Sequence, residues 1–188
     1  MKKLFTIGTS ILALFIITSC SSGSDKSKEE KKSDKLTFSS AIEYNDYIVK
    51  LQEKTIKATL KLGEVMGGGD AEAIKKSFND FGTQAKASLA ELKKLDSFED
   101  NSDLRDKGLK LFQFYVDIYE KDYKEMIDII TKEKVTPKDQ KRVDEIVAKV
   151  SKEEMGFDQD FAAAQQAFAK KNNMKIIENG IQKEIDKQ

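Results

Sequence analysis

The chain has 188 residues, with 33 basic and 33 acidic side chains, no histidine and a single cysteine. The balanced charge gives no electrostatic basis for binding nucleic acid. One cysteine excludes a disulfide framework, and the lack of histidine removes the commonest general base and metal ligand. A charged fraction of 35%, one proline and no tryptophan favour an all-α protein.

The chain begins with a segment typical of export signals. Lys2 and Lys3 precede a mainly apolar run over residues 4–17, which ends at Ile17-Thr18-Ser19-Cys20. The run is shorter than the roughly 20 residues that a membrane-spanning helix needs. A basic start, a short apolar run and small residues before a cut are the parts of a signal peptide. We therefore predict a signal peptide at residues 1–19, cleaved between Ser19 and Cys20.

Ile17-Thr18-Ser19-Cys20 resembles the lipobox of bacterial lipoproteins: an aliphatic residue, a small or β-branched one, a small one, then cysteine. The resemblance implies that Cys20 becomes the first mature residue and carries a diacylglycerol and fatty acids such as palmitate. Two or more acyl chains anchor a protein stably. An ordinary cleaved signal and an uncleaved membrane helix are the alternatives. By this family's sorting rule, Ser21 directs the protein to the outer membrane where a cell has two membranes.

Residues 20–37 are interpreted as the lipidated cysteine and a disordered tether. Residues 21–35 contain only serine, glycine, aspartate, glutamate and lysine, so this segment has no apolar surface to bury. The plain interpretation is a solvated spacer, and the alternative is a sorting or surface-export signal. The folded domain is expected at residues 38–173.

Two amphipathic helices are expected next, each with apolar residues repeating every three or four positions. The first begins at Ser40, whose spacing to Glu43 is that of a capping box, and it ends at the glycines 67–69. The second begins at Asp70, a good N-cap, and ends before a polar turn at residues 96–101.

The third helix is expected to run without a break from Ser102 to about residue 130. It carries two apolar stripes, one interrupted at Asp122 and Glu125, and two stripes predict that it is the most buried helix. Phe114 lies on neither stripe, so we expect it to be exposed and to mark a contact surface.

The fourth helix begins at Thr136-Pro137 and ends at Asn172-Asn173, as one long helix containing Gly156. Residues 174–188 are interpreted as either a short fifth helix or a loose tail. Four long amphipathic segments joined by short turns predict an all-α fold, an antiparallel up-down-up-down four-helix bundle.

A row of polar residues on the first helix is the candidate binding site. Asn45, Gln52 and Thr59 follow a seven-residue step beside the apolar face, and Tyr44 and Thr55 lie within that face. Such a row can bind a small ligand, fix the helix register, or lie at the edge in water. The residues expected on the opposite wall, from the third helix, are Tyr115, Tyr119 and Asp122. The candidate ligand-binding residues are therefore Tyr44, Asn45, Gln52, Tyr115 and Asp122.

Acidic residues gather on the fourth helix at Glu153, Glu154, Asp158 and Asp160. Calcium prefers oxygen ligands, but the chain has no EF-hand spacing and no Glu-x-x-His of a di-iron bundle, so we interpret the cluster as a solvated face. No phosphate loop, nucleophile elbow or Ser/His/Asp set is present. We expect no catalytic residues, no metal site and no cofactor. A cavity lined by paired buried carboxylates would favour an enzyme instead.

The segment Tyr44-Asn45-Asp46-Tyr47-Ile48-Val49, followed by Gln52, resembles the start of helical surface lipoproteins of uncharacterised function from several bacterial groups. The resemblance brings no catalytic residues. The sequence thus predicts a non-enzymatic lipoprotein of the cell envelope whose bundle is a binding or interaction module. The expected partners are membrane lipid, through acylated Cys20, and an envelope or extracellular protein. The alternative is a lipoprotein that binds a small ligand or cation in a polar groove between the first and third helices.

Overall fold

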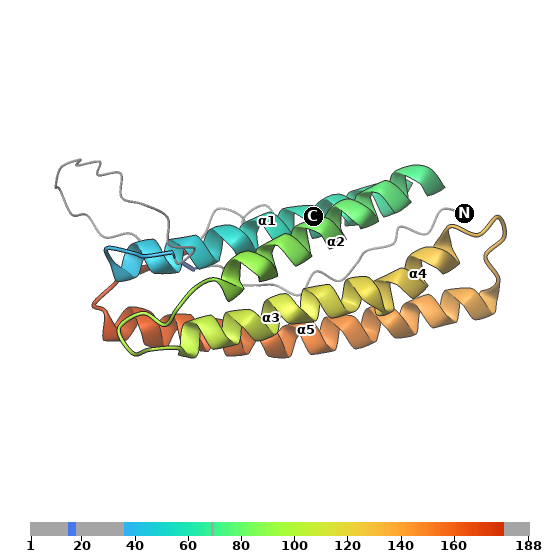
Figure 1. The fold of residues 1–188 in the computed structure, drawn as a ribbon. Coiled ribbons are helices and arrows are strands. Elements are labelled where there is room, and N and C mark those ends of the chain that lie inside the picture. The colour runs from blue at the N-terminus through green and yellow to red at the C-terminus, as the bar shows by residue number, and fades with distance from the viewer. Residues whose placement is uncertain (1–14, 18–35, 69, 179–188) are drawn as a thin grey trace.

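The computed structural model describes residues 15–17, 36–68 and 70–178, and within these it places five helices and two short strands. They are β1 (Phe15–Ile17), α1 (Ala41–Gly68), α2 (Ala71–Lys93), α3 (Asp103–Glu120), α4 (Asp122–Ile130), α5 (Pro137–Lys171) and β2 (Ile176–Glu178). Figure 1 shows α1, α2, the α3–α4 pair and α5 running alternately in opposite directions. The predicted all-α antiparallel bundle is confirmed, with α3 and α4 together forming its third rod.

Local capping explains where α1 and α2 begin. The Ser40 hydroxyl accepts a hydrogen bond from the Glu43 N–H at 3.2 Å, as the capping-box spacing predicts. The Glu43 carboxylate instead accepts from the N–H and hydroxyl of Ser39, at 2.9 and 2.7 Å. The box is therefore offset by one residue. At α2, the Asp70 carboxylate accepts from the Ala73 N–H at 2.8 Å.

The remaining helix ends also follow short-range chemistry. Thr136 and Asp139 bond reciprocally at the start of α5, and Pro137 takes the first helical position. Ser102 precedes α3 as predicted, but its side chain caps nothing. The Asn101 carboxamide oxygen accepts from the Asp103 N–H at 3.1 Å and takes over this role.

The prediction of one continuous third helix is wrong, because the backbone leaves helical geometry at Lys121 (φ −122°, ψ −82°). The two acidic residues that interrupt the apolar stripe lie just beyond this point. Asp122 pairs with Lys149 of α5 at 2.8 Å, and Glu125 pairs with Arg142 at 2.7 Å. The polar interruption of the stripe therefore marks the place where Asp122 and Glu125 form ion pairs with basic residues of α5.

Phe114 is buried, so the expectation that it would be exposed is wrong. Only 5% of its surface is accessible, and its ring centroid lies 5.0 Å from that of Phe157 in α5. Its burial widens the apolar face of α3 beyond the two predicted stripes, since α3 packs against both α2 and α5.

Four rods meet around a glycine of α3. A methyl group placed on Gly108 would lie 3.1 Å from Leu92 of α2, 3.4 Å from Phe161 of α5 and 3.8 Å from Ile48 of α1. These side chains therefore converge from three helices on one point of the fourth. The layer belongs to a single apolar core cluster, whose burial is the main favourable contribution to folding.

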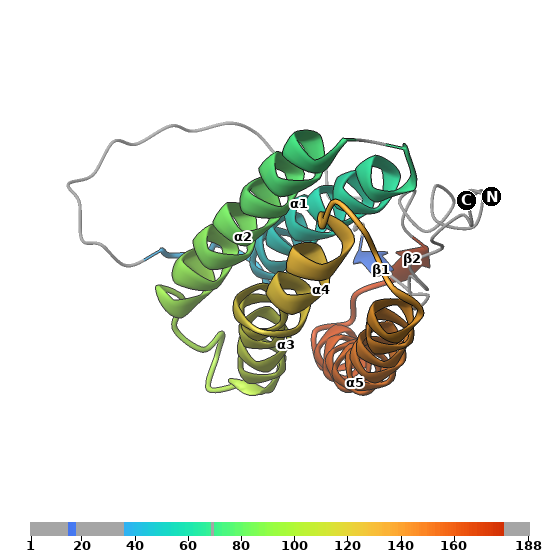
Figure 2. The ribbon, with the colours of Figure 1, turned by 90° about the vertical axis from the view of Figure 1, so that its right-hand side faces the viewer.

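The bundle is closed unevenly. The backbones of α1 and α2, α2 and α3, and α3 and α5 pack closely, whereas α1 and α5 are not among the closely packed helix pairs. On this side β1 contacts both α1 and α5, and Figure 2, viewed along the bundle, shows β1 and β2 there. The strands pair antiparallel, with Ile16 opposite Ile177.

Two sequence expectations fall on these strands. Residues 176–178 form a strand, so a short C-terminal helix is wrong there, and residues 179–188 lie outside the described part of the chain. Residues 15–17, within the expected signal peptide, form β1. The rest of that peptide, its cleavage site at Ser19 and Cys20, and the tether as far as residue 35 are likewise outside the described residues. No helix in the described ranges is long and apolar enough to cross a membrane.

Candidate functional site

A buried pair of amides connects the first and last helices. The Gln165 side-chain nitrogen donates a hydrogen bond of 2.9 Å to the side-chain oxygen of Asn45. Asn45 is 0% exposed and Gln165 is 1% exposed. Since α1 and α5 run antiparallel, this bond fixes which residues of the two helices lie opposite one another.

Continued by helix geometry, this register places a second polar residue of α1 opposite one of α5. A step of seven residues along α1 reaches Gln52, and the same step back along α5 reaches Asp158. A further step reaches Thr59 and Ser151. Two turns of a helix advance the same face by about seven residues, so the opposed positions stay aligned. We call this row the α1–α5 seam; its residues are Asn45, Gln52, Thr59, Ser151, Asp158 and Gln165.

The middle of the seam holds buried polar groups without partners. Gln52 is 0% exposed, and neither its amide nitrogen nor its oxygen has a hydrogen-bond partner among the described residues. Asp158 is 6% exposed, and the same is true of both its carboxyl oxygens. An unsatisfied buried polar group costs about 1–3 kcal/mol, and more if it is charged. These two side chains therefore lower stability unless something binds to them.

Glu154 lies one turn from Asp158 on α5 and is half-buried. Burial raises the pKa of Glu154 to about 7. Burial, together with the charge of Glu154, raises the pKa of Asp158 to about 8. At neutral pH these two carboxyl groups therefore retain their protons to a greater extent than ordinary surface carboxyl groups do.

Two tyrosines from other helices face these carboxyl groups. Burial, and then the charges of Asp158 and Glu154, hold the pKa of Tyr115 in α3 well above its usual value. Burial and the charge of Glu154 likewise raise the pKa of Tyr123 in α4. We define the carboxyl site as the group drawn from four helices: Gln52, Tyr115, Tyr123, Glu154 and Asp158.

The prediction of a solvated acidic face is wrong for Asp158. Glu153 and Asp160 are exposed as expected, and Asp160 pairs with Lys107 at 2.6 Å. The sequence did contain a signal, because Asp158 lies three residues before buried Phe161, in phase with the apolar face. Helical phase therefore predicts the burial of Asp158 better than its charge does.

Two of the predicted site residues have structural partners. The Tyr44 hydroxyl donates to the Asp96 backbone carbonyl at 3.0 Å, and its ring packs against Phe168 near one end of the bundle. Asn45 accepts from Gln165, as described above. The geometry of both residues supports the register role that the sequence left open beside ligand binding.

Thr55, in the same row, also fixes register. Its hydroxyl contacts that of Ser88 in α2 at 3.0 Å, and the Ser88 hydroxyl lies 3.2 Å from the Leu51 carbonyl. This buried network joins α1 to α2, and both of its hydroxyl groups have hydrogen-bond partners. Gln52 thus differs from its neighbours in the row by having no partner.

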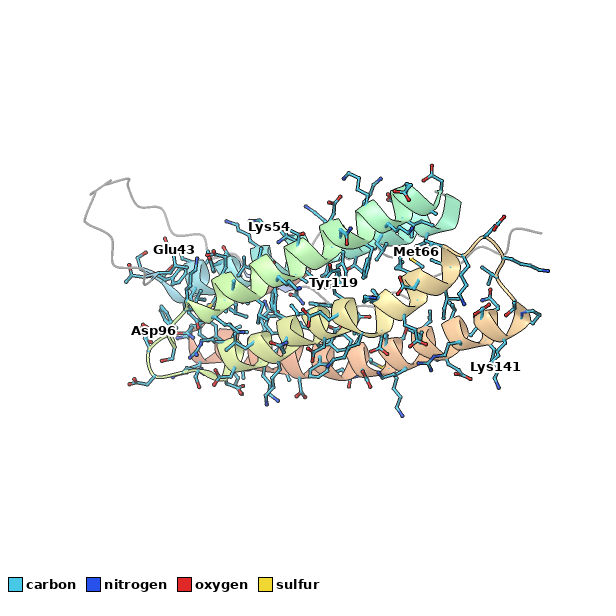
Figure 3. The ribbon with its side chains drawn as sticks, turned by 45° about the vertical axis from the view of Figure 1, so that its right-hand side comes forward. Glu43, Lys54, Met66, Asp96, Tyr119 and Lys141 are labelled. Atoms are coloured by element: carbon cyan, nitrogen blue, oxygen red, sulfur yellow. The ribbon has the colours of Figure 1, made fainter. Side chains whose placement is uncertain are left out.

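The expected opposite wall is divided between different surfaces. Asp122 pairs with Lys149 and lines an outer groove of about 800 Å³ between α2, α3 and α5. Tyr119 packs on Phe78 of α2, with its ring centroid 4.7 Å away, and Figure 3 shows it between α2 and α3. Of the three wall residues, Tyr115 alone is close to the carboxyl groups of the seam.

No group of three or more histidine, cysteine, aspartate or glutamate residues able to hold a metal ion occurs in the described ranges. No family model matches the chain, and no curated protein or solved structure is significantly similar to it.

Proposed function

We propose that the protein is a bacterial lipoprotein, anchored to a membrane through acyl chains on Cys20, whose helical bundle is a binding module and not an enzyme. The lipobox Ile17-Thr18-Ser19-Cys20 carries this proposal, because the chain's only cysteine stands directly after the small residues of a signal peptide. Acylation explains why a chain without other thiols keeps one at this position.

The spacing between anchor and bundle supports the same assignment. The polar residues 21–35 precede α1, which begins at Ala41. The sequence predicts a tether here, and a random coil of that length would span roughly 20 Å on average, from about 5–6 Å times the square root of its length. The bundle is then held off the membrane, in the cell envelope, and on the outer membrane if the cell has two.

Substitution of Cys20 tests the anchor. Cys20→Ala is expected to abolish incorporation of labelled palmitate and to move the protein from the detergent-extracted membrane fraction to the soluble one. Ser24→Ala, in the polar spacer, is the matched control and should leave both unchanged. Palmitate labelling and membrane association that persist in Cys20→Ala would show that the anchor is wrongly assigned.

An envelope or extracellular protein is the partner that the sequence suggests, and the outer groove between α2, α3 and α5 is one surface where it can dock. Proximity labelling around the anchored protein in its own cell tests this. A reproducibly labelled envelope protein, lost when groove residue Phe157 is replaced by aspartate, would identify the partner. Labelling that is unchanged in this variant would exclude the groove.

A small-molecule ligand is the second candidate, and the unpartnered Gln52 and Asp158 favour it. Ligand sites depend on a few convergent polar groups, and the carboxyl site draws such groups from four helices. Native mass spectrometry of the protein extracted from membranes should show a retained small molecule. A mass equal to that of the acylated chain alone would count against this role.

A further inference from the structure

We propose that the carboxyl site binds a small aliphatic ammonium ion, with Asp158 and Glu154 as its anionic partners and the Gln52 carbonyl oxygen as a further acceptor. This inference rests on the small-ligand role proposed above and names the ligand's chemical class.

The first step is the inventory of hydrogen-bonding groups. Both Asp158 oxygens and the Gln52 oxygen are buried acceptors without a donor in the described part of the chain. No lysine or arginine in the described ranges pairs with Asp158 or Glu154. A primary ammonium group carries three N–H donors and one positive charge. Its binding releases to solvent the proton that the raised pKa leaves on a carboxyl group, satisfies three acceptors and neutralises the resulting carboxylate.

Second, the composition of the carboxyl site favours an ammonium ion over a metal ion. The site offers two carboxyl groups, which is fewer than the three acidic, histidine or cysteine ligands of a dedicated metal site. Its other members are an amide and the tyrosines Tyr115 and Tyr123. The interaction of a cation with the face of an aromatic ring contributes about 0.5–2 kcal/mol, and organic ammonium ions are commonly recognised in this way.

The third step concerns the alkyl part of the ligand. One helical turn from Gln52 and Asp158, toward the Asn45–Gln165 pair, lies the layer in which Ile48 and Phe161 meet Gly108. The side chains that meet in this layer are apolar and buried. A short alkyl chain that lies along the seam beside them exchanges water for hydrocarbon, whereas a second charge placed there would be left unpaired.

The last step is access. The α1 and α5 backbones do not pack closely, and β1 contacts both helices on that side. β1 comprises Phe15–Ile17, within the segment that the lipobox assigns to the signal peptide. Cleavage before Cys20 removes β1 together with the signal peptide. In the mature protein the seam is then open on this side, so Gln52 and Asp158, which are buried in the structure with β1 in place, become accessible to a small ligand there.

The test uses the mature protein extracted from membranes, with n-butylamine hydrochloride as the probe. Isothermal titration calorimetry should show saturable binding of butylamine and none of n-butanol, its neutral analogue. Calcium chloride at the same ionic strength should bind at least tenfold more weakly. Absence of saturable butylamine binding, or equal binding of butanol or calcium, would overturn the proposal.

Variants locate the site and separate binding from folding. Asp158→Asn keeps the shape of the side chain and removes its charge, so it should fold and lose at least tenfold in butylamine affinity. Gln52→Leu should do the same. Asp160→Asn, exposed on the same helix, is the matched control and should bind like wild type. If all three variants bind equally, the site is wrong; if native mass spectrometry nevertheless finds a retained neutral molecule, the small-ligand role survives and the ammonium class fails.

Discussion

Gln165 and Asn45 share a hydrogen bond of 2.9 Å although 120 residues of chain separate them. The bond joins the C-terminal part of α5 to the first turns of α1, and both side chains are buried. It sets the register of two helices whose backbones otherwise pack loosely, and this register aligns Gln52 with Asp158. The candidate site thus depends on an amide pair two turns away.

Removal of one amide should be costly. Asn45→Leu leaves the Gln165 nitrogen without this buried acceptor, so we expect a loss of about 1–3 kcal/mol in the free energy of unfolding. Urea denaturation, followed by circular dichroism, measures it. In the double variant Asn45→Leu/Gln165→Leu the loss should be smaller than the sum of the two single losses, because neither amide is left unpaired. Strict additivity would mean that the bond does not couple the two helices.

Stability should fall as the pH rises from 5 to 9. The pKa of Asp158 is raised to about 8 and that of Glu154 to about 7 in the folded protein. Ordinary carboxyl groups have pKa values near 4. Between about pH 4 and pH 8 the folded state therefore binds more protons than the unfolded state does. The groups that face them are Gln52, Tyr115 and Tyr123. Proton binding stabilises the bundle fully below about pH 4, and this contribution is lost as the pH rises through 7–8.

The size of this effect is on the order of 5 kcal/mol between pH 5 and 9, from about 1.4 kcal/mol per unit of pKa difference, with the part from half-buried Glu154 reduced for solvent screening. Urea midpoints of the uncleaved chain, which retains β1, provide the measurement at pH 5, 7 and 9. Asp158→Asn should flatten the profile and raise stability at pH 9. Asp160→Asn should keep the wild-type slope, because the exposed Asp160 has a pKa that its pairing with Lys107 lowers. A flat wild-type profile would show that the carboxyl groups are not buried in solution.

Two glycines at helical positions should respond in opposite ways to alanine. A methyl group on Gly82 of α2 would collide with the ring of Tyr119, so Gly82→Ala should destabilise by about 1–3 kcal/mol. Gly156 of α5 has nothing within 4 Å of the same position, so Gly156→Ala should stabilise by roughly 0.5–1 kcal/mol through helix propensity. Thermal unfolding distinguishes them. Equal effects would mean that the Tyr119 ring of α3 does not lie close to Gly82 of α2.

Helix caps give a further matched pair. Thr136→Ala removes the hydroxyl that accepts from the Asp139 N–H at 3.2 Å, and it should cost about 1 kcal/mol. Ser102→Ala should cost little, because the Ser102 side chain caps nothing and Asn101 serves α3. Urea midpoints of the two variants measure the difference. A larger loss in Ser102→Ala than in Thr136→Ala would contradict the observed capping.

Most of the fold could be predicted because its helices are encoded locally. Caps at Asp70 and Thr136 and a steady three-four apolar repeat define the ends and faces of the rods without reference to distant residues. The break at Lys121 could not be placed in this way. Its signal in the sequence is the polar interruption at Asp122, which fits a polar position within one continuous stripe as well as it fits the start of a second helix.

The candidate site was predicted in part, from one side only. The heptad row of Asn45 and Gln52 was visible on α1, but its matching residues lie on α5, more than 100 residues further along the chain. A seven-residue step from Gln165 to Asp158 is present in the sequence, and nothing local says that the two rows meet. The charge of Asp158 predicts an exposed side chain. Its burial depends on the residues that pack around it, and local sequence does not identify them.

The loose α1–α5 side also has a consequence for the order of folding. Neighbouring rods are joined by short turns, so their contacts form at low entropic cost. The α1–α5 side instead brings together segments at opposite ends of the domain, and such non-local contacts form slowly. We therefore expect it to close last as the chain folds, and to open first in the native state. Amide hydrogens there should exchange with solvent through local opening, while those between α2 and α3 exchange only when the whole domain unfolds.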